Sequence, residues 1–378
     1  MRLADVVALV EGWYPPHRAE EWDSVGLVCG DPDAEVRSIL LAVDPVQAVA
    51  DEAVAGAADL VIVHHPLYLR GTTTVAASTS KGRVVHDLIR SGCALLTAHT
   101  NADSPAGGVS EAIATALGLS EIRPLDPDPH EPRDKIVTFV PLSHADQVRT
   151  ALAEAGAGSI GDYDSASFVS PGQGRFRPLA GANPTIGTVG DLEVVEEERI
   201  EVVADRSIRS RVLAALIRTH PYEEPAYDVL ELADLPDPTR GSGRIGVLPD
   251  EVTLREFADH AASVFPQTAG GLRVAGDPER PVTRVALCGG AGDFLLGAAR
   301  RAGADVYVTS DLRHHPASES VEDGGPALID VAHWAAESLW LPVLRDRLVD
   351  ALGARPNDTV GVSVHISTTT TDPWTFRV

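Results

Sequence analysis

Two consecutive histidines follow an apolar stretch near the start of the chain. His64 and His65 come directly after Leu60–Val63, which has the composition of a buried strand, and Pro66 then bends the chain. Because successive strand residues point in opposite directions, both imidazoles can face one site only where the chain leaves the strand. Imidazole is the commonest metal ligand in proteins. The pair therefore indicates a metal site or, alternatively, two histidines that cap a strand end.

A second group of candidate ligands follows the strand expected over residues 94–98. Asp103 would supply a hard oxygen ligand, although an aspartate before a helix is commonly a turn or capping residue. His99 is a candidate metal ligand, proton carrier or partner of a ligand. Gly107 and Gly108 allow a tight turn before a helix that we expect to begin near Val109.

The third group lies near the C-terminus. If a helix begins at His333, Glu337 shares its face four residues later and the two can hold one ion or bridge two. A surface pair on a helix is the plainer alternative. With His64, His65 and Asp103, the set has nitrogen and oxygen ligands but no thiolate. Such a set suits two divalent ions among Zn, Fe, Mn, Ni and Co, with Glu337 as the natural bridge.

A further His-His-Pro sequence contains His314 and His315. Histidines in a polar loop are commonly only solvated. The alternative is that they line the same cleft and act, together with His99, in proton transfer or substrate contact.

The elements that must position these residues alternate between strand and helix. Strands are expected over 39–43, 60–63 and 94–98, with helices over 46–54 and around 84–89 between them. This order predicts βαβ units in an α/β fold with a mostly parallel sheet. Ligands bind beyond the carboxyl ends of such strands, where His64, His65 and the segment 99–103 fall.

An internal similarity links the two ends of the chain. The sequences ILLA and ADLVIV (39–42 and 58–63) match VALC and ADVYVT (285–288 and 304–309) at one offset of 246 positions, and AHTNAD (98–103) matches AHWAAE (332–337). At the same offset, His64 and His65 align with Ser310 and Asp311. We therefore expect a pseudo-duplicated, three-layer core, with the site where its halves meet.

The middle of the chain has a different pattern. A Pro- and Asp-rich segment (124–134) precedes a β-α-β-β-α-β order that contains a loop over 171–190, and residues 236–244 close the segment. This order predicts a ferredoxin-like α+β domain. We expect it to be an insertion over 126–244 in a discontinuous metal-binding core formed by 1–125 and 245–378.

Composition limits the function. The 378 residues include 55 acidic and 31 basic side chains, a net charge of -24, which disfavours nucleic acid as a partner. No apolar stretch is long enough for a membrane span. Three scattered cysteines fit a reducing cytoplasm, where we expect the protein to reside.

Several ordered motifs resemble the Nif-three-like dinuclear metal-centre family, whose members are called GTP cyclohydrolase I type 2 homologs. They are EEWDSVGLVCGDP (20–32), VIVHHP (61–66), HTNADSPAGGVSEAIA (99–114), YVTSDLRHH (307–315), DVAHWAAE (330–337) and STTTTDPW (367–374). GRFRPLAGANPTIG (174–187) and HPYEEPAYDV (220–229) resemble a CutA- or PII-like insertion found in a subset of that family. Ala332 and Ala336 stand where the family commonly has Gly and Thr, and neither change removes a ligand.

The resemblance implies metal ligands at His64, His65, Asp103, His333 and Glu337. It also implies a toroidal homohexamer, a trimer of dimers, whose metal sites face an internal cavity. The expected function is a metal-dependent hydrolase that acts on a nucleotide such as GTP through a metal-activated water. The alternative is a non-catalytic metal-binding or regulatory assembly with a ligand-sensing insertion.

Overall fold

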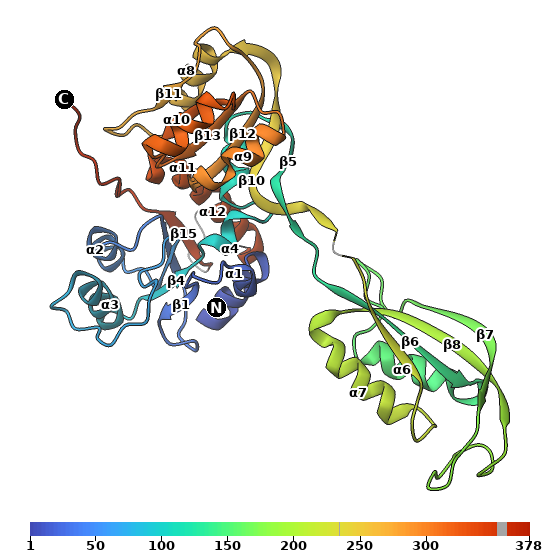
Figure 1. Ribbon diagram of the computed structural model, residues 1–378. Coiled ribbons are helices and arrows are strands. Elements are labelled where there is room, and N and C mark those ends of the chain that lie inside the picture. Colours follow the sequence, from blue (N-terminus) through green and yellow to red (C-terminus); the bar gives the residue numbers. More distant parts are fainter. Residues whose placement is uncertain (234, 354–360) are drawn as a thin grey trace. The chain divides into compact units, whose positions relative to one another are not determined.

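The computed structural model describes residues 1–233, 235–353 and 361–378. These residues form two compact units, one built from residues 1–128 and 238–378 and the other from residues 129–237 (Figure 1). Strands β5 (Ser120–Pro129) and β10 (Pro236–Thr253) join the units. The boundaries expected from the sequence, after residues 125 and 244, fall within these two strands.

The first sheet of the larger unit has the strand order β1-β4-β3-β2-β15. Strands β4, β3, β2 and β15 are parallel to one another, and β1 pairs antiparallel with β4 at the edge. The bounds are β1 (Gly26–Cys29), β2 (Ser38–Ala42), β3 (Leu60–Val63), β4 (Ala94–Thr97) and β15 (Ser363–Ile366).

The second sheet of this unit repeats that arrangement. Its order is β11-β14-β13-β12-β10-β5, in which β14, β13 and β12 are parallel and β11 pairs antiparallel with β14. The remaining bounds are β11 (Arg273–Ala275), β12 (Pro281–Ala291), β13 (Val306–Ser310) and β14 (Ala327–Val331). In both sheets an antiparallel edge strand is followed by three parallel strands in the same connection order.

Two equivalent aspartates show the duplication at the level of single hydrogen bonds. The Asp59 carboxylate, just before β3, accepts hydrogen bonds from the backbone N–H groups of Arg37 and Ser38. Asp305, just before β13, accepts them from Thr283 and Arg284. These residues keep the sequence offset described above, which confirms the predicted pseudo-duplicated core.

Helices cover both faces of each sheet. One apolar cluster contains the facing sides of both sheets and helices α1, α5, α8, α11 and α12. Helices α2 and α3 cover the outer face of the first sheet, and α9 and α10 that of the second. Each half is therefore a three-layer α/β/α arrangement that shares its inner helices with the other. The bounds are α1 (Leu3–Trp13), α2 (Gln47–Ala55), α3 (Ser80–Ser91), α4 (Thr100–Asp103), α5 (Val109–Ala116), α8 (Leu254–Val264), α9 (Leu296–Arg301), α10 (His314–Glu322), α11 (His333–Ser338) and α12 (Trp340–Leu352).

The smaller unit has the predicted β-α-β-β-α-β order. Its four-stranded antiparallel sheet has the order β7-β8-β6-β9, and helices α6 and α7 pack on one face, as in a ferredoxin-like domain. The bounds are β6 (Arg133–Pro141), α6 (Ala145–Glu154), β7 (Ser167–Phe176), β8 (Glu193–Asp205), α7 (Arg209–Thr219) and β9 (Tyr227–Glu231). In the described part of the chain no helix is both long and apolar enough to span a membrane.

Residues 171–176 of the expected loop form the end of β7 instead, so the loop prediction is wrong there. Residues 124–129 and 236–244, for which no strand was predicted, lie in β5 and β10. Prolines and glycines obscure the strand pattern in all three segments. Strands β5 and β7 stand at sheet edges, where a proline without an N–H group removes no hydrogen bond from the sheet.

A buried carboxylate in the smaller unit provides a test of that fold. Asp134 receives hydrogen bonds from Arg209 at 2.7 and 2.9 Å and from Arg206 at 3.2 Å. The bond from Arg209, acting against burial, lowers the pKa of Asp134. The resulting stabilisation is present above the unfolded pKa of about 3.9 and is lost as the pH falls through the folded value.

Replacing Asp134 with Asn should therefore lower the free energy of unfolding of the smaller unit by roughly 2 kcal/mol at neutral pH. The difference from the unaltered protein should shrink as the pH falls below about 4. Urea denaturation of the full chain at several pH values measures both effects. Asp228→Asn, at an exposed position in β9, is the matched control and should change little. Equal stability of the Asp134 variant at pH 7 would contradict this account.

Candidate metal centre

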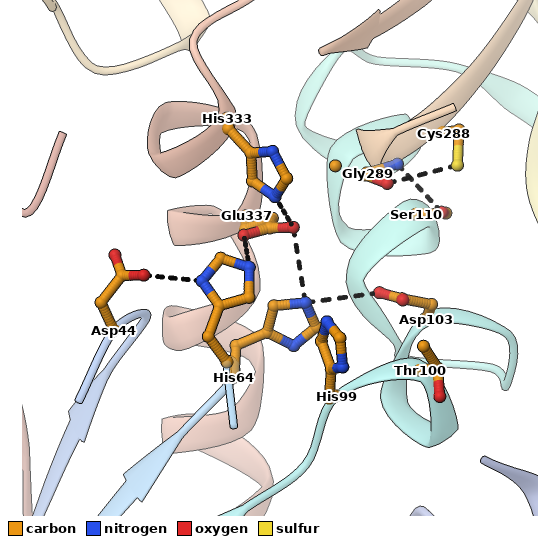
Figure 2. A network of polar contacts seen from close by, with 12 residues as sticks. Asp44, His64, His99, Thr100, Asp103, Ser110, Cys288, Gly289, His333 and Glu337 are labelled. Carbon is orange, nitrogen blue, oxygen red and sulfur yellow. Dashed lines mark hydrogen bonds and ion pairs between the residues drawn. The ribbon is translucent and has the colours of Figure 1, made fainter. Parts of the chain in front are cut away.

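The end of strand β3 and the helices α4 and α11 of the larger unit bring the predicted ligands together (Figure 2). His64 and His65 follow β3 directly, and Asp103 ends α4, the short helix after β4. His333 and Glu337 lie one turn apart on α11, which follows β14 of the second sheet. The carboxyl ends of strands from both halves of the core thus contribute to one site, as the internal similarity predicts.

The carboxylate of Glu337 lies at the centre of this group. Its Oε1 is 2.8 Å from His333 Nε2 and 3.5 Å from His64 Nε2, and its Oε2 is 3.0 Å from His65 Nε2. His64 Nε2 is also 3.6 Å from Asp103 Oδ1. Glu337 is only 2% exposed and His64 is fully buried. The structure therefore places all five predicted ligands in one cluster, in which His64 and Glu337 are buried and the other three are partly exposed.

Four imidazoles in this cluster are held by a hydrogen bond at Nδ1. His64 is bonded to a backbone carbonyl, whereas the other three are bonded to aspartates. Such contacts fix the orientation and tautomer of a metal-binding histidine and leave the opposite nitrogen available. The pairs are His64–Ala98 O (2.9 Å), His65–Asp44 (2.7 Å), His99–Asp23 (2.8 Å) and His333–Asp311 (2.7 Å).

Electrostatic coupling keeps Glu337 ionised. Burial would raise the pKa of its carboxyl, but the charges of His64 and His65 outweigh burial and hold that pKa well below its usual range. Burial would also lower the pKa of His65, yet Glu337 and Asp44 raise it to about 10. For His333, burial is again outweighed by Glu337, which raises the pKa to about 9. An ionised carboxylate surrounded by oriented imidazoles is the charge pattern of a divalent cation site.

A glycine-rich segment at the end of β12 leaves space beside the carboxylate. Gly290 has a φ of +67°, and a Cβ at this position would lie 2.8 Å from Glu337 Oε1 and 3.3 Å from His333 Nε2. Gly290 is therefore required both for its backbone conformation and for the room it leaves.

The available atoms fit a metal. Two groups of ligand atoms lie within 4.8 Å of one another, one from His64, His65 and His99 and one from His65, His333 and Glu337. His64 Nε2 and Asp103 Oδ1 are buried without a hydrogen-bond partner among the described residues. Buried polar atoms are rarely left unsatisfied, so these two are suited to an ion. The set supplies nitrogen and oxygen donors, and nothing in it selects one divalent metal.

The remaining candidates from the sequence lie in two different places. His99 lies inside the cluster, with its ring centroid 5.1 Å from that of His64. His314 and His315 lie on the exposed start of α10, and neither belongs to a group of metal-ligating atoms in the described chain. The sequence did not predict Asp23, Asp44 or Asp311 as partners of the imidazoles. Two signals were available, the position of Asp23 within the EEWDSVGLVCGDP motif and the alignment of His65 with Asp311.

Comparison with known proteins identifies the family. Residues 1–373 match the model of Duf34/NIF3 (NGG1p interacting factor 3). The chain belongs to the Duf34/NIF3 family. It is 50% identical over 376 residues to a Mycobacterium tuberculosis protein and 37% identical over 372 residues to a Bacillus subtilis protein, both named GTP cyclohydrolase 1 type 2 homolog. These matches cover 99% and 98% of this chain and 97% of each relative.

Solved structures of Duf34/NIF3 relatives have the same architecture. A Bacillus cereus protein described as related to NIF3 is 37% identical, with a TM-score of 0.77. A Staphylococcus aureus protein is 29% identical, with a TM-score of 0.84. Each comparison covers 100% of this chain and 99% of the other. The family resemblance predicted from the sequence motifs is thereby confirmed.

Gly290→Ala tests the space beside Glu337. The added Cβ would push the carboxylate and His333 apart, so we expect the affinity for Zn²⁺ or Mn²⁺ to fall by at least about tenfold, measured by titration against a chelating indicator. Gly324→Ala is the control, because Gly324 has a similar φ of +71° but nothing within 4 Å of its would-be Cβ. If both variants kept the affinity of the unaltered protein, Gly290 would have no part in the centre.

The aspartates that orient the imidazoles should contribute to metal affinity almost as much as the ligands do. Asp44→Ala removes the acceptor at His65 Nδ1, and the loss of such a partner costs about 10- to 100-fold in metal affinity. Asp51→Ala is the control, since Asp51 is exposed and, among the described residues, accepts a side-chain hydrogen bond only from Gln47. Unchanged affinity in the Asp44 variant, with its folding intact, would show that His65 needs no such support.

Proposed function

We propose that this protein is a hydrolase with a dinuclear divalent-metal centre whose ligands are His64, His65, Asp103, His333 and Glu337. The observation that carries the proposal is the position of Glu337, whose two carboxylate oxygens face different histidines. A carboxylate in this position suits a bridge between two ions. His64 and His333 face its Oε1, and His65 faces its Oε2.

Bound divalent ions supply Lewis acidity, which lets a water molecule ionise near neutral pH and neutralises negative charge on a substrate. The His99 imidazole is suited to accept a proton. His99 donates through Nδ1 to Asp23, and Asp23 also accepts hydrogen bonds from the backbone N–H and hydroxyl of Thr100. Burial is outweighed by these bonds, so the pKa of Asp23 is lowered and its carboxylate stays ionised. Asp23 thus fixes the orientation of the His99 ring.

A cavity of about 720 Å³ opens onto the His65 and His333 side of the cluster. This volume is ample for a small-molecule substrate. Its lining combines the indoles of Trp334 and Trp374 with the guanidinium group of Arg377. Indole rings stack on planar bases and guanidinium groups bind phosphates, so we propose a nucleotide as the substrate. The names of the relatives, GTP cyclohydrolase 1 type 2 homolog, agree with a purine nucleotide.

We further propose a homohexamer built as a trimer of dimers. The family resemblance of the sequence motifs supports this assembly. In the tail that lines the cavity, Trp374 and Phe376 remain 71% and 78% exposed in the single chain, an arrangement suited to contact with another copy. Sedimentation of the full-length protein measures the assembly directly, and a monomer at micromolar concentration would contradict it.

The activity is tested by screening metal-loaded protein against nucleotides and phosphoesters and following product formation by chromatography. We expect turnover of at least one nucleotide. His99→Ala should lower the rate by about 100-fold or more while both ions remain bound, because the proton-accepting group is lost. His86→Ala, on the exposed side of α3, should leave the rate unchanged.

Two results would contradict parts of this proposal, the first the hydrolase activity and the second the role of His99. The first is metal-loaded protein that turns over no member of the library, which would favour the alternative of a non-catalytic metal-binding assembly. The second is full activity in His99→Ala, which would remove His99 from the proton path while leaving the metal centre in place.

A further inference from the structure

The smaller unit contains a cavity of about 840 Å³ that belongs to no site described so far. It lies between the β7–β8 hairpin and the segment that follows α7. All of its lining residues come from residues 139–226, within this unit. Its volume is in the range of cavities that bind small molecules.

A buried carboxylate faces this cavity. Glu197 on β8 is 6% exposed and lines the cavity wall. Its Oε1 accepts a hydrogen bond of 2.7 Å from the Tyr222 hydroxyl. Among the described residues it forms no ion pair with a lysine, arginine or histidine. A buried carboxylate that lacks a positive partner is costly, so a cationic group in the cavity would relieve that cost.

The surrounding residues hold this carboxylate in place. A Cβ at Gly174 would lie 2.2 Å from Glu197 Oε2, so the carboxylate rests directly on the backbone of β7. Tyr222 is fixed in turn, because its backbone N–H donates to His220 Nδ1 and His220 Nε2 donates to the Phe139 carbonyl. These contacts restrict the Glu197 carboxylate to one position, although it forms no ion pair among the described residues.

The two side chains next to Glu197, His220 and Tyr222, supply no positive charge, and Arg199 on the same strand is paired with Glu201. Burial lowers the pKa of His220, so this imidazole is neutral and does not offset the charge of Glu197. Burial and the bond to Glu197 raise the pKa of Tyr222, so its hydroxyl remains a donor. The rings of Phe176 and Tyr222 meet edge to face with centroids 5.5 Å apart and both line the cavity. Aromatic faces beside a carboxylate favour organic cations through cation–π attraction.

We propose that this cavity is a binding site for a small organic cation, an amine or guanidine, whose charged group contacts Glu197 between the rings of Phe176 and Tyr222. The guanidinium groups of Arg175 and Arg177 line the same cavity. They would meet a carboxylate at the other end of a zwitterionic ligand. The site lies wholly in the smaller unit and does not depend on the metal centre.

Isothermal titration of the full-length protein tests the proposal with 2-phenylethylamine, agmatine, L-lysine and L-arginine. 2-Phenylethanol serves as the neutral counterpart of the first probe. At least one cation should bind about tenfold more tightly than the neutral compound. Glu197→Gln keeps the shape and the contact with Tyr222 but removes the charge, and should weaken that binding about tenfold or more. Glu198→Gln is the matched control, because neighbouring strand residues face opposite sides of the sheet.

A second variant protects the test against loss of folding. Gly174→Ala should displace the Glu197 carboxylate and weaken the cation without altering Glu197 itself. His64→Ala should bind the cation as the unaltered protein does, which separates this site from the metal centre. The proposal is overturned if no probe binds more tightly than 2-phenylethanol, if folded Glu197→Gln and Gly174→Ala both retain full affinity, or if His64→Ala abolishes binding.

Discussion

The buried Glu337 carboxylate is the interaction on which the larger unit depends. A carboxylate at 2% exposure would be strongly disfavoured without positive partners, and three imidazoles supply them within 3.5 Å. Two of those imidazoles come from the first sheet and one from the second half of the core. The cluster can therefore form only when both halves are folded and packed against each other. Metal binding and the packing of the core are two consequences of the same arrangement.

The duplicated architecture explains how distant residues meet. In each half, parallel strands end at the same edge, and the first residues after these strands are the ones that carry polar groups. The halves use this edge differently. The first half places His65 after its central strand, whereas the second places Asp311 at the matching position and uses it to orient His333. The site is therefore asymmetric, with most imidazoles from one half and the central carboxylate from the other.

Much of this could be predicted from sequence because the signals were local and repeated. Short-range periodicity predicts the strand before His64 and the helix that carries His333 and Glu337. The internal repeat predicts the matching segments of the two halves. The orienting aspartates could not be predicted in the same way, because Asp23 and His99 are 76 positions apart and only the tertiary fold makes them neighbours. Strands β5 and β7 were not predicted in full because their local signals are misleading. Their prolines are local signals for irregular structure, and only the sheet order shows that they occupy edges.

The two units present different chemistry. The metal centre gathers imidazoles around a central carboxylate, whereas in the smaller unit Glu197 lines a cavity with two aromatic rings and forms no ion pair among the described residues. The first arrangement suits inorganic divalent ions and the second an organic cation.

The most direct test of the central claim is the metal content of the full-length protein, combined with anomalous diffraction to locate the ions. We predict two divalent ions per chain, one on each side of the Glu337 carboxylate, and loss of both positions in Glu337→Ala. One ion or fewer per chain at saturation, or ions located away from His64, His65 and His333, would contradict the dinuclear centre.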